Sequence, residues 1–549
     1  MIGPRRPHDS QPEDFDEQDN PAPLRTAIEE VRELIDRTLL AYQGNPRAQR
    51  ALREQQHRLD EPLRIAVAGK IKAGKSTLIN ALVGEHLAAA DAGECTRVVT
   101  WYRHATAPRV TLRPLQGADR QLRIHRGHAG LELDLDGATA EQIEALIVDW
   151  PSRGLDVLTL IDTPGIDSNS TAISARTLEV LTPEGQPPNV DGVIYLMRQP
   201  HASDVRFLES LGRHLDGRGI VNTVVVLSRA DEVEAGRIDA LVSARKIAAR
   251  YAAEPMMRDL TPTVLPVAGL VAETGRTLRQ DEFAALTKLA ALSKSELDRM
   301  MLSADRFCAP DAPVAVDQAE RVELLGRLGL FGLRLAVVLL RGGIADATTL
   351  ADELVRRSGL QQLRALLDVH FTQRTDELKA RSALVAIGYL LRTTPGRDTG
   401  ELARVVERVL TGSHAFRELQ VLPMLRAPGA AIPPALAAEA ERLLGGHGTG
   451  IEQRLGLADD AAPEDPAEEA RREQAEAELA DIPEEWEYEP EVAAPVETAD
   501  LRDLTLEALG RWRAMSVNPA TDHVGAQIAD AVARSCEGML AELDQIDAA

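Results

Sequence analysis

The sequence has few aromatic residues, few cysteines and no long apolar run. Aromatic residues make up only 3% of the 549 positions although 44% are hydrophobic, so leucine, alanine and valine must fill the cores, which favours a helix-rich protein. The three cysteines, Cys95, Cys308 and Cys536, are far apart and favour a reducing cytoplasmic compartment over a disulfide framework. No uncharged apolar run reaches the length of a membrane span, and residues 1–23 are polar. We therefore expect neither a transmembrane helix nor a signal peptide.

The negative charge is concentrated in two segments. Of the net charge of -24, residues 459–500 carry -15 and residues 1–23 carry -4, which leaves -5 for the rest of the chain. Runs of this kind are usually solvated and disordered, so we expect a disordered acidic tail at 1–23 and a disordered acidic linker at 458–500. No basic groove is evident, and no nucleic-acid partner is expected.

The most informative motif is a glycine-rich loop between an apolar run and a helical pattern. Residues 69–76 read Gly-Lys-Ile-Lys-Ala-Gly-Lys-Ser, which matches the P-loop pattern, and they follow the apolar run Leu63–Ala68. The backbone N–H groups of such a loop cradle phosphates. Lys75 would reach the β- and γ-phosphates and the Ser76 hydroxyl would bind Mg²⁺. The predicted nucleotide contacts here are Gly69, Gly74, Lys75, Ser76 and Thr77.

Two further elements predict a metal-assisted phosphate site. Asp162-Thr163-Pro164-Gly165 ends an apolar run and fits the D-x-x-G element that follows the P-loop in GTPases. Asp162 would hold Mg²⁺ through a water, and the Gly165 N–H would contact the γ-phosphate and move on hydrolysis. A threonine between the two motifs would complete the metal shell; Thr96 is the first choice and Thr100 the reserve.

Guanine specificity is predicted from Ser228-Arg229-Ala230-Asp231, at the end of another apolar run. A carboxylate at Asp231 accepts two hydrogen bonds from guanine that adenine cannot supply, and buried polar groups reject the wrong base strongly. Arg229 stands where N/T-K-x-D elements have lysine, and it can still stack on the base. The Ala268 N–H would meet the guanine O6.

With these residues placed, the chain resembles bacterial dynamin-like large GTPases, and most closely the isoniazid-inducible dynamin-like family of actinobacteria in its C-subunit type. Residues 64–101, 228–240 and 324–384 carry most of the similarity. The resemblance implies a GTPase domain with a helical neck and trunk, GTP and Mg²⁺ as substrate and cofactor, nucleotide-dependent self-association, and membrane remodelling. It further implies a peripheral protein at the inner face of the plasma membrane, which forms a homodimer or oligomer or assembles with a paralogous dynamin-like partner.

The sequence departs from the wider family in its catalytic groups. Lys72 lies where eukaryotic dynamins have serine, and a cation there could stabilise transition-state charge as an arginine finger does. A solvated lysine is an equally good interpretation. Ile166 follows Gly165, so no side chain there can orient water. We expect slow basal turnover that rises on self-association.

The fold class expected is an α/β P-loop GTPase domain, with a mixed and mostly parallel sheet, plus an extended α-helical bundle. Apolar residues step by three or four along residues 24–42 and again along 524–546. Each of these seams needs a partner, and we expect them to meet. The domain boundaries expected are neck helices at 24–60, a GTPase domain at 61–372 with a helical insert at about 275–345, a trunk at 373–457, and C-terminal helices at 501–549 that return to the neck.

Two apolar stretches are candidates for membrane contact. Leu328–Leu340 has the length of a buried core helix and is better explained as one. Leu419–Pro434 combines apolar residues with turn chemistry that could form an exposed tip. Two alternatives to membrane remodelling stay open at this point: a regulatory GTPase of the translation or RNA-assembly kind, and a helical scaffold with weak hydrolysis.

Overall fold

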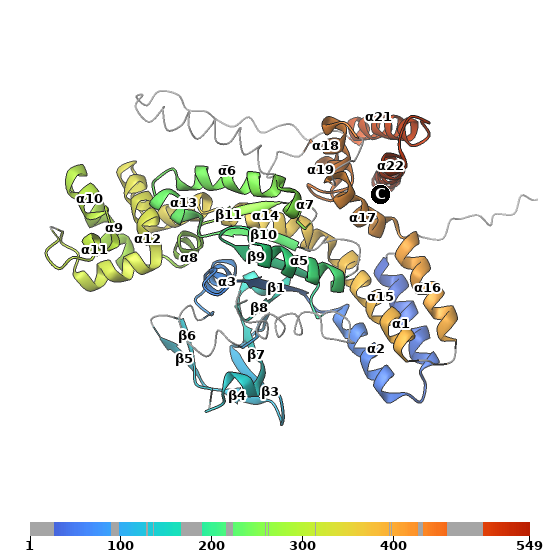
Figure 1. Ribbon diagram of the computed structural model, residues 1–549, viewed down its shortest axis with the longest axis horizontal. Coiled ribbons are helices and arrows are strands. Elements are labelled where there is room, and N and C mark those ends of the chain that lie inside the picture. The colour runs from blue at the N-terminus through green and yellow to red at the C-terminus, as the bar shows by residue number, and fades with distance from the viewer. Residues whose placement is uncertain are drawn as a thin grey trace, which may run out of the picture.

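The computed structural model describes thirteen stretches of the chain (Figure 1), namely residues 27–88, 98–127, 130–135, 137–165, 189–215, 223–258, 260–261, 263–312, 314–394, 396, 398–426, 432–457 and 498–548. The predicted tail at 1–23 lies outside these residues, and so does the predicted linker up to residue 497. The last three residues of that linker are not disordered, because they begin the helix Thr498–Ser516.

A mixed sheet forms the centre of the molecule, and nine of its strands lie in the described residues, in the order β11-β10-β9-β1-β8-β2-β7-β3-β4. The five strands from β11 to β8 run parallel, whereas β2 is antiparallel to β8 and β3 is antiparallel to β7. The expected mixed, mostly parallel sheet is thus confirmed. The strands are β1 (Leu63–Gly69), β2 (Thr100–His104), β3 (Arg109–Pro114), β4 (Arg120–Leu122), β7 (Ile143–Trp150), β8 (Leu158–Asp162), β9 (Gly192–Met197), β10 (Thr223–Ser228) and β11 (Val264–Val267), with a separate hairpin of β5 (Ile124–Gly127) and β6 (Gly130–Leu133).

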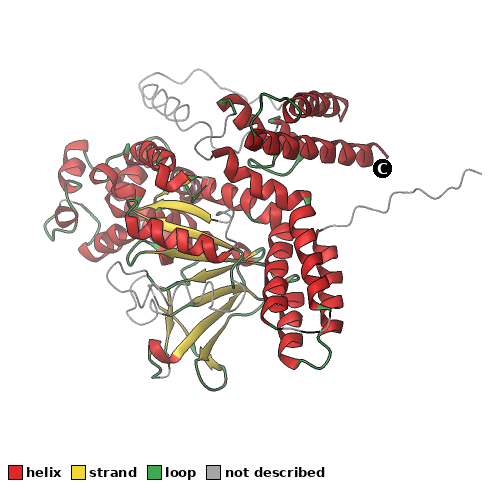
Figure 2. Ribbon diagram, turned by 45° about the vertical axis from the view of Figure 1, so that its right-hand side comes forward, coloured by secondary structure: helices red, strands yellow, loops and turns green. Residues whose placement is uncertain are grey.

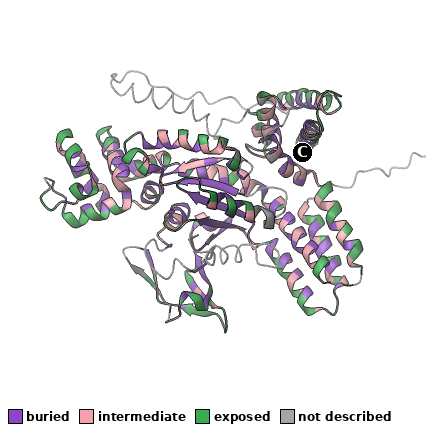
Figure 3. Ribbon diagram, in the orientation of Figure 1, coloured by how far each residue is buried: buried purple, intermediate pink, exposed green. Residues whose placement is uncertain are grey.

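Helices cover both faces of the sheet, and the central strands are buried on both sides (Figure 3). Near-continuous apolar runs make such strands, because each face must pack against helices. The helices of this part are α3 (Lys75–Val83), α5 (Ala202–Leu215), α6 (Ala240–Ala253), α7 (Pro255–Arg258), α8 (Gly269–Thr277), α9 (Gln280–Ala290), α10 (Lys294–Met300), α11 (Ala304–Phe307), α12 (Gln318–Arg341), α13 (Ala347–Arg357) and α14 (Leu360–His370).

Two helical bundles extend from the sheet domain (Figures 1 and 2). The first bundle contains α1 (Ala27–Ala41), α2 (Pro46–Arg58), α15 (Thr375–Thr393) and α16 (Thr399–Gly412), which share one apolar core. The second bundle contains α17 (His414–Arg426), α18 (Pro434–Leu443), α19 (Ile451–Leu455), α21 (Thr498–Ser516) and α22 (His523–Ala548), which share another.

The expectation that the N- and C-terminal seams meet is wrong. Val31 and Ile35 of α1 pack with α15 and α16, whereas Ile528 and Val532 of α22 pack with α17 and α21. An amphipathic pattern shows only that a helix needs an apolar partner. The α1 seam packs on α2, α15 and α16, and the α22 seam packs on α17, α18 and α21.

Most apolar side chains of the two candidates for membrane contact are buried in the described residues, and Val338, at 54% exposure, is an exception. Leu328–Leu340 lies within α12, where most of its side chains are buried in the core of the sheet domain. In the other stretch, Val421, Leu422 and Leu425 are buried in the second bundle, and residues 427–431 lie outside the described residues. No helix in the described part of the chain is long and apolar enough to cross a membrane.

Candidate functional site

The P-loop connects β1 to α3 and has an unusual backbone. Gly69 has φ +150°, and a Cβ atom on it would lie 2.5 Å from the carbonyl oxygen of Leu196, so only glycine fits there. Gly74 has φ +93° and precedes the first residue of α3. Lys72 has φ +61°, which is rare for a residue with a side chain and marks a constrained functional loop. The loop therefore depends on glycine at positions 69 and 74 for its backbone shape.

Lys75, Ser76 and Asp162 come together because β1 and β8 are parallel neighbours. Val67 pairs with Asp162 in this register, and the Ser76 Oγ donates to Asp162 Oδ2 at 3.4 Å. Burial raises the pKa of Asp162 to about 6, although the charge of Lys75 opposes the shift. Burial also lowers the pKa of Lys75, against the effect of Asp162.

The side chains of Ser76 and Asp162 fit a magnesium ion. The Oδ1 atom of Asp162 is buried and has no hydrogen-bond partner among the described residues. A buried carboxylate oxygen without a partner is costly, and such groups need an explanation in a ligand, a water or an ion. Mg²⁺ is typically held by one or two protein oxygens together with water and substrate phosphates. Asp162 and Ser76 supply that kind of donor set.

The D-x-x-G segment lies directly against the P-loop. Thr163 donates to the Val67 carbonyl oxygen twice, from its backbone N–H at 3.2 Å and from Oγ1 at 3.0 Å. A Cβ atom at Gly165 would lie 2.8 Å from Ile71 Cγ1 and 2.9 Å from Ile71 Cα, so glycine permits the close approach. The structure thus brings the predicted Gly165 to the loop that carries Lys72.

A cavity between the P-loop, β10 and α8 is suited to a base. It measures about 540 Å³ including the space at its mouth, and its lining residues are Ala73, Gly74, Thr77, Leu78, Leu196, Val226, Ser228, Arg229, Asp231, Glu232, Val267, Gly269 and Leu270. The predicted residues Gly74, Thr77, Arg229 and Asp231 are therefore brought to one place.

Among the ionisable residues that line this cavity, Asp231 has the most strongly shifted pKa. It is 6% exposed, and burial raises its pKa to about 6. Arg229, with φ +54°, directs its guanidinium to Glu232 at 2.6 Å and not to Asp231. The acceptor oxygens of Asp231 thus have no hydrogen bond from another side chain in the described part of the chain.

Comparisons with known proteins agree with this geometry. The model of the dynamin family matches residues 65–230. The isoniazid-induced protein IniC of Mycobacterium tuberculosis is 39% identical over 519 residues, which cover 93% of this chain and 98% of that protein. The chain belongs to the dynamin family of GTPases.

Other relatives of this dynamin-family GTPase are less similar in sequence. A bacterial dynamin-like protein of Nostoc punctiforme is 28% identical over 192 residues, which cover 32% of this chain and 26% of that protein. A solved structure described as an oligomerised bacterial dynamin pair for long-range sensing and tethering of membranes shares 12% identity and a TM-score of 0.31, and the match covers 95% of this chain and 91% of that one. A score of this size carries no weight in the assignment, which rests on the sequence matches.

One predicted contact of the dynamin-family GTPase needs revision, and another falls outside the described residues. The Ala268 N–H donates to the Ser358 carbonyl oxygen at 2.9 Å, so it is not free for guanine O6, contrary to our expectation. Its neighbours Gly269 and Leu270 line the cavity instead. Thr96 lies outside the described residues, and the reserve, Thr100, is buried in β2 opposite Asp162.

Sequence reasoning missed a buried anchor of the P-loop. Lys70 Nζ lies 3.0 Å from Asp204 Oδ2, and Tyr195 donates to Asp204 Oδ1 at 2.6 Å. Asp204 is 1% exposed and also accepts the N–H of His201 at the start of α5. The one sequence signal was an acid in the first turn of a helix, which is common and marks no partner.

Proposed function

We propose that this GTPase hydrolyses GTP with Mg²⁺ and uses nucleotide-dependent self-association to remodel membranes as a peripheral protein. The observation that carries the hydrolysis step is the buried, unpartnered Oδ1 of Asp162 beside the Ser76 hydroxyl. Ser76 and Asp162 would hold the magnesium ion, Asp162 through a water, and Thr96 is the further ligand that we propose. When bound, Mg²⁺ offsets the negative charge of the phosphates.

The chain's own residues supply binding and orientation. The loop from Gly69 to Gly74 presents backbone N–H groups to the phosphates, and Lys75 places a positive charge at their end. Gly165 packs closely against Ile71, and its N–H would contact the γ-phosphate there. Asp231 accepts the N–H groups of guanine, and the Arg229 side chain covers the base.

Lys72 is the residue that we propose as the internal cation of catalysis. Its side chain is exposed, and its left-handed backbone holds it at the outer edge of the P-loop. We expect Lys72→Ala to lower kcat about tenfold at unchanged GTP affinity, because one charge that stabilises the transition state is lost. Lys72→Arg should keep most of the rate. A full rate in Lys72→Ala would show that the lysine is only solvated.

The two bundles support a mechanical role. Asp191 connects the first bundle to the sheet domain, since its carboxylate accepts from Arg58 at 3.2 Å, Arg64 N at 2.9 Å and Ser382 Oγ at 2.8 Å. Arg374, the residue before α15, connects the start of the first bundle to the second by donating to the carbonyl oxygens of Leu444 and Gly445 at 2.9 and 2.7 Å. Motion at the nucleotide site would be transmitted through these polar joints.

The deciding experiment measures GTP hydrolysis by the full chain with and without liposomes of graded anionic content. Lys75→Ala serves as the inactive control. Stimulation by lipid that is absent in the control, together with a dimer that forms only with a GTP analogue, supports the proposal. A rate indifferent to every liposome, in a protein that remains monomeric, would overturn the membrane part and favour a regulatory GTPase.

A further inference from the structure

Helix α12, in the helical insert, is interrupted at Gly329. This residue has φ +64° and ψ 176°, whereas its neighbours on both sides are helical. That combination of angles is essentially restricted to glycine, because any Cβ atom collides with the backbone. A break of this kind inside a 24-residue helix sacrifices helical hydrogen bonds, so it needs a compensating reason.

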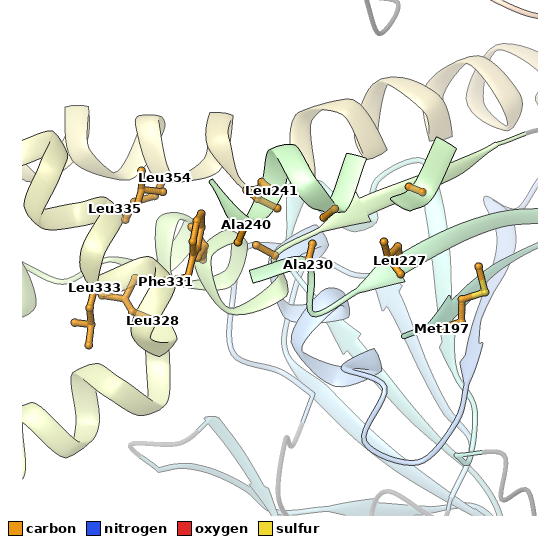
Figure 4. Close-up of a cluster of buried hydrophobic side chains, with 14 of the residues drawn as sticks. Met197, Leu227, Ala230, Ala240, Leu241, Leu328, Phe331, Leu333, Leu335 and Leu354 are labelled. Atoms are coloured by element: carbon orange, nitrogen blue, oxygen red, sulfur yellow. The ribbon is translucent and has the colours of Figure 1, made fainter. Parts of the chain in front are cut away.

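The break lies against the base cavity. A Cβ atom at Gly329 would be 3.7 Å from Asp231 Oδ2 and 3.8 Å from Leu270 Cδ1, and both of these residues line the cavity. Beyond the break, Phe331 joins the core that also contains Ala230, the residue before Asp231 (Figure 4). The backbone of α12 thus forms a wall behind the carboxylate.

Polar contacts fix α12 on both sides of the break. Before it, the Arg327 carbonyl oxygen accepts from Thr274 Oγ1 at 2.8 Å, and the Arg327 guanidinium is 2.5 Å from Glu282 Oε1. After it, the Arg334 guanidinium donates to the Met301 carbonyl oxygen at 2.6 Å and to the Gly236 carbonyl oxygen, in the loop that carries Asp231. The helix therefore bridges α8 and the base-reading loop.

We infer that the break at Gly329 is a positioning device for Asp231, by which the helical insert sets the affinity and selectivity for guanine. This inference rests on the proposed role of Asp231 as the base reader. Gly329 touches no substrate and acts only through Asp231 and Leu270. Without the break, a straight α12 would displace the loop between residues 229 and 236.

The main test compares Gly329→Ala with Gly326→Ala in the full chain. Gly326 lies one turn earlier in the same helix, and a Cβ atom there would meet nothing within 4 Å. For Gly329→Ala we expect KM for GTP to rise about tenfold while kcat stays unchanged, since one misplaced charged hydrogen bond is worth about that factor. The ratio of the inhibition constants of ADP and GDP should fall by a similar factor. Gly326→Ala should match the parent protein in both.

A second variant keeps the inference falsifiable if Gly329→Ala fails to fold. Arg334→Gln removes the bonds to the Gly236 and Met301 carbonyl oxygens on the far side of the break, and it should raise KM for GTP in the same direction. Unchanged KM and unchanged base selectivity in a folded Gly329→Ala protein, or in Arg334→Gln, would overturn the inference. The variant Asp231→Ala distinguishes a failure of this inference from a failure of the proposed contact between Asp231 and guanine. If that variant keeps its preference for GDP over ADP, the proposed base reader itself is wrong.

Discussion

Asp231 in the base cavity and Glu418 in the second bundle are equally buried, each 6% exposed, yet they ionise in opposite ways. Burial raises the pKa of Asp231 to about 6. Burial would also raise that of Glu418, but hydrogen bonds and charge from His414, Arg454 and Ser535 lower its pKa to about 2. The Arg454 guanidinium lies 2.6 Å from its Oε1 and the Ser535 hydroxyl 2.7 Å.

The opposite pKa shifts distinguish a carboxylate that stabilises the fold from one that is suited to binding a ligand. Glu418 has its partners within the chain, so its charge stabilises the second bundle. Asp231 has no hydrogen bond from another side chain in the described part of the chain, and for Asp162 the Ser76 hydroxyl and the Lys75 charge offset only part of the cost of burial. A pKa of about 6 in place of 3.8 corresponds to about 3 kcal/mol of free energy for each. A fold tolerates that cost where binding needs the charged group.

The first prediction tests this contrast at the metal site. We expect Asp162→Asn to reduce Mg²⁺-dependent hydrolysis on the order of a thousandfold, because the metal position is lost. The same change should stabilise the ligand-free protein at pH 7 by up to about 3 kcal/mol, since a costly buried charge is removed. Denaturant unfolding and turnover assays measure the two effects. Asp60→Asn, which removes only an exposed ion pair with Arg32, should leave turnover unchanged and have little effect on stability. A destabilised Asp162→Asn would refute the interpretation.

The same kind of change should have the opposite effect in the second bundle. Glu418→Gln leaves the partly buried Arg454 without its counter-ion, so we expect a loss of about 3 kcal/mol in the free energy of unfolding of that bundle. Hydrogen exchange of α17 and α22 reports it locally. Glu537→Gln is the control, because its ion pair with Arg513 is exposed and worth little. Unchanged protection in Glu418→Gln would mean that the cluster is not structural.

Replacement of the Asp231 carboxylate by an amide tests its proposed contact with guanine. Asp231→Asn should weaken GTP binding by about tenfold to a hundredfold, because an amide cannot accept both guanine N–H groups. Xanthosine triphosphate should bind the variant better than GTP does, since its C2 carbonyl can accept from the new amide. Competition with a fluorescent nucleotide measures both affinities. A variant that still prefers GTP would remove Asp231 from the base site.

The smallest expected effect is a dependence on pH. In the folded protein the pKa of Asp231 is raised to about 6. Because only the charged carboxylate can accept both guanine N–H groups, binding of GDP favours the deprotonated form of Asp231. The Kd for GDP should therefore rise as pH falls below 6, by about tenfold per pH unit at most. Measurement without Mg²⁺ isolates this group from Asp162, and Asp231→Asn should lose the slope. The second bundle, in contrast, should lose the contribution of Glu418 only as pH falls from about 4.5 towards 2.

The sequence was most informative where one short segment carries both backbone and side-chain requirements. The P-loop and Asp162–Gly165 were found because glycine, lysine and carboxylate positions are fixed relative to each other along the chain. Ala268 was misassigned because the partner of its N–H, Ser358, lies 90 residues away in the sequence. No local pattern reports such a contact.

The other parts of the fold were harder to predict, because they depend on contacts between segments far apart in the sequence. The seams in α1 and α22 were recognised as amphipathic, but periodicity gives no partner. The strands β3 to β7 were not predicted. The exposed Arg109 and Arg113 interrupt the apolar pattern of β3, whereas the apolar run Ala145–Val148 in β7 was overlooked. The break at Gly329 was taken as part of a continuous helix, because one glycine among apolar residues fits either conformation.

The way in which the chain passes between its parts determines how each joint can move. Two passages connect the sheet domain to the first bundle, from α2 to β1 and from α14 to α15. Only one, from α16 to α17, connects the first bundle to the second. A body attached at two points can rock about the line through them but resists torsion, whereas a body attached at one point can also swivel. At the outer joint the hydrogen bonds from Arg374 add to this single passage, and such bonds, unlike a peptide link, can break and re-form without cleavage of the chain.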